Sequence, residues 1–203
     1  KLKYNNQNIL KIHKKTYKKN FKNFSLKELS HINFKPKINF ILYILKFPRF
    51  KMNDKDNKRT KYLVNYLNFQ FLEINSYINK NNTIKNYDII LKTKNNITSK
   101  ESKIINQIAK KYFKKRIRLF TNKKNSYVNA EIFGAENKCK VIISNISTAD
   151  FLIKIINNKV KIVQYNKLVY EFNIKDKFIN KNNVDMKISK LKNYYKMDKY
   201  III

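Results

Sequence analysis

The stretch Lys110–Lys124 constrains this chain most, because it joins a run of charge to the end of an apolar pattern. Its sequence, KKYFKKRIRLFTNKK, contains eight Lys or Arg residues and three aromatic residues, and it contains no Asp or Glu. Such a stretch predicts a surface that binds a polyanion. The alternative interpretation is the solvated end of a helix, which a charge run taken alone favours. The rest of the chain repeats the same chemistry, and this repetition favours the polyanion.

The charge of the whole chain points the same way. There are 46 Lys and Arg residues against 13 Asp and Glu residues, which gives a net charge of +33 on 203 residues. Self-repulsion on this scale opposes a compact state unless a partner supplies counter-charge. With 43% hydrophobic and 14% aromatic residues, the chain lies outside the composition of disordered tails. We therefore expect a globular body with basic extensions, ordered in part by nucleic acid or another anionic surface.

The type of cation adds information about the source and the contacts. Gly occurs once, Pro twice and Trp never, whereas Lys, Asn and Ile dominate, which is typical of an extremely AT-rich genome. Lys offers phosphate a point charge, whereas the planar guanidinium of Arg forms two-pronged contacts. The four Arg residues are therefore the best candidates for positional anchors: Arg49, Arg59, Arg116 and Arg118.

The N-terminal third begins with a basic segment and continues into apolar stretches. Residues Lys1–Phe24 are rich in Lys and lack acids, which predicts an extended arm along a phosphate-lined surface or, as the alternative, a frayed tail. Ser25–Glu28 has the spacing of a capping box, so a short helix is expected to begin there. Lys37–Leu45 reads as a buried strand.

The next part contains a basic loop and a core segment. A polar loop follows through Asn53 to Arg59, and its flanking aromatics either stack on bases or cap the core. The apolar stretch Tyr62–Tyr77 is core, but its pattern fits a helix in one half and a strand in the other. Asp88–Leu91 predicts another short strand.

The centre of the chain gives the clearest helix prediction. Thr98–Glu101 forms a capping box, and apolar residues then recur at helical spacing on one face. The helix is expected to run to about Arg116 and to turn its Lys-rich face outward. The apolar residues are Ile104, Ile105, Ile108, Ala109, Tyr112 and Phe113.

The C-terminal half predicts an α+β fold. Tyr127–Phe133 and Lys140–Ser144 are expected to pair as a hairpin turning at Gly134, the only glycine. Ser147–Asp150 caps a second short helix, and Val160–Tyr165 pairs with Leu168–Ile174. The order α-β-β-α-β-β predicts a small antiparallel sheet covered by amphipathic helices, with basic extensions. An amphipathic helix after Asn183 and a docked apolar end, Tyr200–Ile203, complete the chain. The expected domains are an N-terminal arm (1–35), a first α/β lobe (36–95), an RNA-binding α+β lobe (96–175) and a C-terminal helix or tail (176–203).

Several kinds of site are not predicted. One glycine is too few for a P-loop or a dinucleotide-binding turn. Cys139 is alone and is expected as a buried strand residue, and His13 and His31 have no ligand partners at metal-binding spacing. Paired carboxylates and a nucleophile triad are not evident, so we expect no enzyme, no cofactor, no metal and no small-molecule substrate. The longest apolar run, Ile38–Leu45, is too short to span a bilayer, and Leu2–Leu10 lacks the apolar core of a secretory signal.

A Lys-, Asn- and Ile-rich, Gly-poor chain with basic arms resembles the organelle-encoded mitochondrial ribosomal proteins of protists with AT-rich organelle genomes. This resemblance in composition implies a structural role on ribosomal RNA in the mitochondrial matrix, beside neighbouring ribosomal proteins, without catalysis, and with the small subunit favoured. The alternative is a basic accessory subunit of a mitochondrial respiratory or ATP-synthase complex, which has less reason to carry a net charge of +33.

The candidate RNA-binding residues come from the N-terminal segment, the loop between Arg49 and Arg59, and the stretch Lys110–Lys124. They are Lys14, Lys15, Lys18, Lys19, Arg49, Lys51, Lys58, Arg59, Lys110, Lys111, Lys114, Lys115, Arg116, Arg118, Lys123 and Lys124.

Overall fold

The computed structural model describes residues 6–45, 56–93, 97–120, 128–144, 147–164 and 201–202. The strands form one six-stranded sheet in the order β3-β2-β1-β4-β5-β6, and every neighbouring pair is parallel. The strands are β1 (Phe40–Leu45), β2 (Asp88–Thr93), β3 (Ile117–Phe120), β4 (Cys139–Ser144), β5 (Lys161–Gln164) and β6 (Ile201–Ile202). The helices are α1 (Asn6–His31), α2 (Asp56–Lys80), α3 (Ser99–Phe113), the 3-10 helix η1 (Lys114–Arg116), α4 (Ala130–Gly134) and α5 (Thr148–Ile156).

The prediction of a small antiparallel sheet is wrong. Strands and helices alternate from β1 to β5, and this order produces a parallel sheet because each parallel neighbour needs a long crossover connection. The prediction failed at Tyr127–Phe133, which was expected as a hairpin strand, whereas its residues from Ala130 onward belong to helix α4. With that strand replaced by a helix, β4 has no hairpin partner and joins β1 and β5 in parallel.

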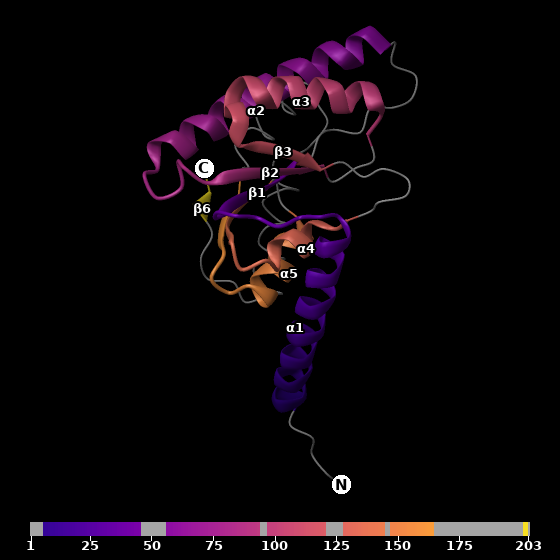
Figure 1. The fold of residues 1–203 in the computed structure, drawn as a ribbon, viewed down its shortest axis with the longest axis vertical. Helices are drawn as coiled ribbons and strands as arrows, with labels where there is room; N and C mark the ends of the chain where they lie inside the picture. The colour runs from indigo at the N-terminus through magenta and orange to yellow at the C-terminus, as the bar shows by residue number, and fades with distance from the viewer. Residues whose placement is uncertain are drawn as a thin grey trace.

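The molecule has three layers. Helices α2 and α3 cover one face of the sheet, and α1, α4 and α5 lie on the other (Figure 1). Successive side chains of a strand point to opposite faces. In β1, Ile41, Tyr43 and Leu45 accordingly pack under α2 and α3, whereas Phe40, Leu42 and Ile44 pack against the other helices.

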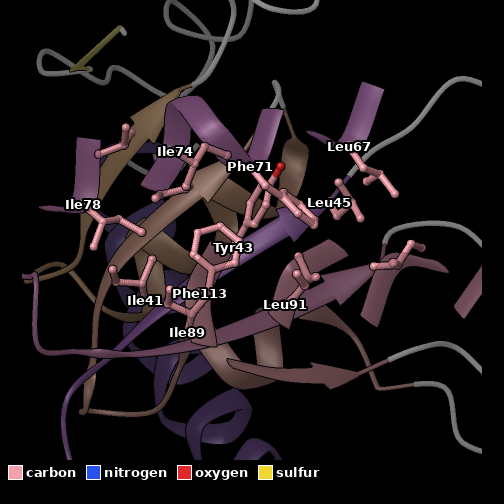
Figure 2. Close-up of a cluster of buried hydrophobic side chains, with 14 of the residues drawn as sticks. Ile41, Tyr43, Leu45, Leu67, Phe71, Ile74, Ile78, Ile89, Leu91 and Phe113 are labelled. Carbon is pink, nitrogen blue, oxygen red and sulfur yellow. The ribbon is translucent and has the colours of Figure 1, made fainter. Parts of the chain in front are cut away.

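Both faces of the sheet are buried, and this explains the continuous apolar runs of the central strands. All six residues of β1 are buried, as the sequence predicted for this strand. Figure 2 shows the core between the sheet and α2, where the Tyr43 ring meets the Phe71 ring edge-on with centroids 5.8 Å apart. The Phe71 ring in turn contacts Phe113 of α3 at 5.3 Å. These rings join β1 to both helices of this face.

The ambiguous stretch Tyr62–Tyr77 is helical and belongs to α2. Its buried residues recur at helical spacing, and Leu63, Leu67, Phe71, Ile74 and Ile78 all lie in the core. The polar loop predicted to reach Arg59 ends earlier, because α2 begins at Asp56.

Both later capping boxes are confirmed. The Thr98 hydroxyl accepts a hydrogen bond from the Glu101 amide at 3.2 Å, and the Glu101 carboxylate accepts from the Thr98 amide at 2.7 Å. Ser147 caps α5 in the same way, with Asp150 in the position of Glu101. These reciprocal bonds satisfy amides that the first turn of a helix otherwise leaves without partners. The starts of α3 and α5 were therefore readable from sequence.

The N-terminal segment is helical rather than extended. Helix α1 passes through Ser25, so the helix start predicted there is wrong: the buried Ser25 hydroxyl donates to the Phe21 carbonyl at 2.7 Å, within the helix. Helix α1 ends at His31, and Asn33 just beyond it has a φ of 52°, which Asn tolerates. The Phe34 amide then donates to the Leu29 carbonyl at 2.8 Å, which closes a Schellman-type cap and turns the chain toward β1.

Gly134 is required for close packing rather than for a turn. It ends α4 without a positive φ, and a Cβ atom at this position would lie 2.5 Å from side-chain atoms of Ile153 in α5. No non-glycine residue fits this approach without displacing Ile153. Cys139 is a buried strand residue, as predicted, and burial raises the pKa of its thiol.

The two central lobes predicted from sequence contribute to the same sheet, β1 and β2 from residues 36–95 and β3 to β5 from residues 96–175. The boundary expected at Asn95 and Asn96 lies outside the described residues, as do Leu168–Ile174 and the helix expected after Asn183. Near the end of the chain, Ile201 and Ile202 pair with Val163 and Gln164 of β5.

Asn157, which follows α5, binds the part of the chain that runs from the end of α4 to the start of β4. Its side-chain amide donates to the carbonyl oxygens of Gly134 at 3.2 Å, Glu136 at 3.3 Å and Cys139 at 3.3 Å. These bonds hold the end of α5 to the connection between α4 and β4. The neighbouring Asn158 is exposed.

We predict that Asn157→Ala lowers the free energy of unfolding by about 1–3 kcal/mol, because it leaves partly buried carbonyls without their donor. Asn158→Ala is the matched control and should change it by less than about 0.5 kcal/mol. Urea denaturation of the two variants measures both values. Equal effects would show that the Asn157 amide does not stabilise this corner.

Candidate nucleic-acid interface

Cations from distant parts of the sequence gather at one edge of the sheet. Because the strands are parallel, the five connections that lead into β1 to β5 all end at the same edge. These connections, residues 32–39, 81–87, 114–116, 135–138 and 157–160, contain one acid, Glu136. We call their cations, with the last two Lys residues of α3, the amino rim. Its members are Lys35, Lys37, Lys85, Lys110, Lys111, Lys114, Lys115, Arg116, Lys138 and Lys159.

The rim is broad enough for an extended ligand. Five adjacent strands at about 4.8 Å spacing extend over roughly 19 Å from β3 to β5. The side chains of Lys35, Lys37, Lys110, Lys111, Lys114 and Lys159 are exposed along it.

Some cations near this edge hold the fold together instead. The Lys138 ammonium donates to the carbonyl oxygens of Pro36 at 2.9 Å and Lys37 at 2.8 Å, so it ties the entry of β4 to the entry of β1. The Lys154 ammonium donates to the carbonyls of Asn158 at 2.8 Å and Val160 at 2.6 Å, and partial burial lowers its pKa. Helix ends carry carbonyls without helical partners, and Lys satisfies them. The helix-end interpretation therefore fits Lys154 and, as solvated cations in the last turn of α3, Lys110 and Lys111. It does not fit Lys138, whose acceptors lie in the connection into β1, or the exposed Lys35, Lys37 and Lys159, which lie outside the helices.

Helix α3 presents the best-defined part of the rim. Its buried face consists of Glu101, Ile105, Ala109 and Phe113, whereas Lys103, Gln107, Lys110 and Lys111 are exposed, as predicted. The helix ends at Phe113 and not near Arg116, because Lys114 leaves the helical conformation. The Lys111 ammonium lies 5.2 Å from the centre of the Tyr112 ring.

The structure describes the stretch Lys110–Lys124 as far as Phe120. Lys110, Lys111 and Lys114–Arg116 precede β3 at the amino rim, with Arg116 half-buried. Arg118 lies within the edge strand β3 and is exposed. Lys123 and Lys124 lie outside the described residues, and in the sequence they follow the opposite end of β3.

The loop candidates that the structure describes lie at the opposite edge. Lys58 and Arg59 lie at the start of α2, which follows the carboxyl end of β1. Arg49 and Lys51 lie outside the described residues, in the sequence between β1 and α2. The structure therefore does not bring Lys58 and Arg59 to the amino rim.

The carboxyl edge contains the point, between β1 and β4, where the strand order reverses and where open α/β sheets commonly bind ligands. There the Ser144 hydroxyl donates to the Asp150 carboxylate at 2.5 Å, and the Ser147 amide donates to the same oxygen at 3.2 Å. The polar groups at the end of β4 are thus bound to one another. The single glycine of the chain lies in α4, away from this edge.

The N-terminal candidates lie on α1. Its C-terminal part packs against α4 and α5, and its N-terminal half extends beyond them, away from the sheet (Figure 1). Lys14, Lys15, Lys18 and Lys19 lie in this half, with Lys19 exposed and Lys18 half-buried. Lys pairs three or four residues apart destabilise an exposed helix by about 0.2–0.5 kcal/mol each, and no acid precedes Glu28 to offset them.

The sequence-based prediction missed the single cations that complete the rim, Lys35, Lys37, Lys85, Lys138 and Lys159. Lys35 and Lys37 share one short connection and each of the other three lies alone in its own, so no local charge density marks them. These cations share one feature, a position shortly before a strand. This feature indicates a common surface only when the strands are known to be parallel.

Lys92 is a buried cation near the end of β2. Its ammonium donates to the Thr93 carbonyl at 2.8 Å, and its side chain is 3% exposed. Burial lowers the pKa of Lys92 to about 8, and the nearby Glu131 carboxylate of α4 partly opposes this shift. The charged form is therefore held at a cost in the folded state.

Lys114 has a backbone conformation that favours glycine. Its φ is 55° and its ψ is −136°, at the junction of α3 and η1. A side chain in this region costs about 1 kcal/mol or more, because Cβ clashes with the backbone.

We predict that Lys114→Gly raises the free energy of unfolding by about 1 kcal/mol, because glycine adopts this conformation freely. Lys111→Gly, which removes the same charge from a helical position, should lower it by about 1 kcal/mol. Thermal denaturation of both variants tests the pair. A destabilised Lys114→Gly would show that the Lys114 side chain contributes more than its backbone costs.

We also predict that Lys92→Met stabilises the protein by about 1–3 kcal/mol at pH 7, since it removes a buried charge at the expense of one hydrogen bond. The folded state loses the Lys92 proton near pH 8 and the unfolded state near pH 10.5, so the unfolded state binds more protons between these values. Wild-type stability therefore gains from Lys92 deprotonation as pH rises, and the advantage of the variant should shrink from pH 8 to 10.5. Taking the difference between the free energies of unfolding of the wild type and the variant at each pH cancels the contribution of Cys139, which both proteins contain. A difference in the free energy of unfolding that stays constant between pH 8 and 10.5 would show that Lys92 does not titrate in this way.

Other kinds of site were sought in the part of the chain that the structure describes. No group of three or more His, Cys, Asp or Glu side chains is placed there to hold a metal ion. Within the same residues, no helix is both long and apolar enough to cross a membrane. No protein-family model matches the chain, and no curated protein matches it.

Proposed function

We propose that the protein is a structural constituent of a mitochondrial ribosome, in the small subunit, that binds and stabilises folded ribosomal RNA without catalysis. The observation that carries this proposal is the amino rim, in which five connections that contain one acid bring exposed cations to one edge of the sheet, where Asp88 begins β2. The compositional resemblance to organelle-encoded ribosomal proteins supports the location.

The chemistry of the rim suits a phosphate backbone. Lys ammonium groups neutralise phosphates and release their bound counterions, which makes binding strongly dependent on salt. Point charges position the protein without reading bases. Folded RNA presents shape and backbone geometry, so little base specificity is needed.

The rigid core supports the same role. The rim cations are attached to parallel strands whose two faces are buried, and Lys138 fixes the entry of β1 to that of β4. Side chains on such a frame keep their spacing when RNA binds. A frame of this kind favours recognition of a preformed RNA surface over wrapping of a flexible strand.

We predict that the protein binds folded RNA with a steep salt dependence and that replacing Lys110, Lys111, Lys114 and Arg116 by Gln reduces the slope of log Kd against log salt by about three. A surface control variant carries the same change at Lys27, Lys61, Lys100 and Lys103, which are exposed and lie off the rim. Both variants lower the net charge by the same amount. A smaller salt slope in the rim variant alone therefore assigns the phosphate contacts to the rim. Equal slopes in the two variants would refute the rim as the binding site.

Sedimentation of a mitochondrial lysate tests the assignment to a ribosome. The protein should migrate with small-subunit ribosomal RNA on a gradient of moderate salt and should leave that fraction at high salt. Migration with a membrane complex would contradict the proposal.

A further inference from the structure

We propose that RNA crosses the amino rim as one continuous sugar-phosphate backbone, which contacts the connections into all five strands from β3 to β5 at the same time. This inference rests on the proposed function and names the form of RNA that the rim takes. An unpaired strand and one strand of a duplex share this chemistry, and the choice of probe in the test separates the two sources.

The entries of the central strands are bonded directly to one another. The Asp88 amide, at the start of β2, donates to the Asn39 carbonyl at 3.2 Å, and the Phe40 amide, at the start of β1, donates to the Lys138 carbonyl at 2.9 Å. The Lys138 ammonium also binds the connection into β1. The connections into β2, β1 and β4 therefore lie side by side at this edge of the sheet.

Exposed cations occupy both halves of this edge. We call the connections into β3 and β2, with the end of α3, the β3 half, and the connections into β1, β4 and β5 the β5 half. The exposed cations of the β3 half are Lys85, Lys110, Lys111 and Lys114, and those of the β5 half are Lys35, Lys37 and Lys159. One ligand must reach both halves to meet all of them.

The acids of this edge do not cancel either half. Asp88 begins β2, Glu136 lies in the connection into β4, and both side chains are half-buried. The Glu136 carboxylate accepts a hydrogen bond from the Lys138 amide at 3.4 Å, within its own connection. Each half therefore keeps more cations than acids.

A continuous backbone fits the spread of these charges better than a small anion does. A small anion is held by donors that converge on one point, as in a glycine-rich phosphate loop. The rim cations are instead distributed over the entries of five strands, which extend over roughly 19 Å. A stacked strand of nucleic acid carries one phosphate about every 3.4 Å, so the rim has room for about six nucleotides.

The test uses the full chain and two variants that each remove one half of the rim. The rim variant described above removes cations of the β3 half, and the four-residue surface variant is its control. The β5-half variant replaces Lys35, Lys37 and Lys159 by Gln. Its control replaces three exposed residues that lie off the rim, Lys27, Lys61 and Lys100.

The probes are oligouridines from about 3 to about 12 nucleotides long, and duplexes of the longer ones with oligoadenosine. Each probe displaces a fluorescent copy of the longest oligouridine, and fluorescence anisotropy gives its Kd over a range of salt concentrations.

In the wild type, the slope of log Kd against log salt should increase in magnitude with length and level off near about six nucleotides, because a longer chain meets no further rim cations. With the longest probe, each half variant should bind at least about tenfold more weakly than its control at about 50 mM salt. With the shortest probe, which cannot reach both halves, each should lose less than about twofold.

This dependence on length supports the inference whether the single strand or the duplex shows it, and the probe that shows it identifies the source of the backbone. A β5-half variant that binds the longest probes as tightly as its control would overturn the inference. Equal losses for the shortest and the longest probes would overturn it as well.

The outcomes also separate this inference from the proposed function. If the rim variant loses affinity for folded RNA while the β5-half variant behaves like its control, the protein binds RNA at the end of α3 and no backbone crosses the rim. If the wild type binds no RNA at low salt, both ideas fail.

Discussion

Burial of both faces of a parallel sheet is the constraint on which the rest of this structure depends. A chain with a net charge of +33 repels itself, and the free energy that opposes this repulsion comes from apolar surface removed from water. The central strands supply residues to both sides at once: Tyr43 packs under α2 while Leu42 packs against α4 and α5 on the opposite face. Two cores therefore share one layer of backbone.

Because both faces of the sheet are buried, charged side chains are restricted mainly to the outside of the helices and to the edges of the sheet. Strand interiors and inner helix faces are occupied mostly by apolar residues, so the described cations lie mainly on outer helix faces and in the connections at the amino edge, with Lys92 buried in β2 and Arg118 exposed in β3 as exceptions. Because the strands are parallel, connections of one kind meet at one edge, and cations from residues as distant as Lys35 and Lys159 become neighbours in one rim. The basic surface is thus a consequence of the topology as much as of the composition.

The helix starts were predictable because their signals are local. Thr98 with Glu101 and Ser147 with Asp150 form capping boxes within four residues, and the structure contains both. The same pattern at Ser25 was misleading, because α1 continues through it and the hydroxyl bonds to a carbonyl one turn earlier. A capping pattern indicates a helix start only where the preceding residues are not helical, and the Lys-rich segment gave no clear apolar period to show that they are.

The sheet was not predictable to the same degree, because strand pairing is not local. The single glycine suggested a turn at Gly134, whereas its role is to let α4 approach Ile153 of α5, a contact between segments that sequence does not align. The Asn157 side chain binds three carbonyls between Gly134 and Cys139, and nothing in the sequence distinguishes it from its exposed neighbour Asn158.

The sequence by itself determined that the chain is a basic globular protein, that β1 and β2 are buried strands, and that α3 turns its Lys residues outward, because composition and periodicity act over neighbouring residues. The tertiary structure alone decided that the strands are parallel and that Lys35, Lys37, Lys85 and Lys159 join Lys114 and Arg116 in one rim. These features depend on which strands lie side by side, and that order follows from the packing of whole helices on a sheet rather than from any short pattern.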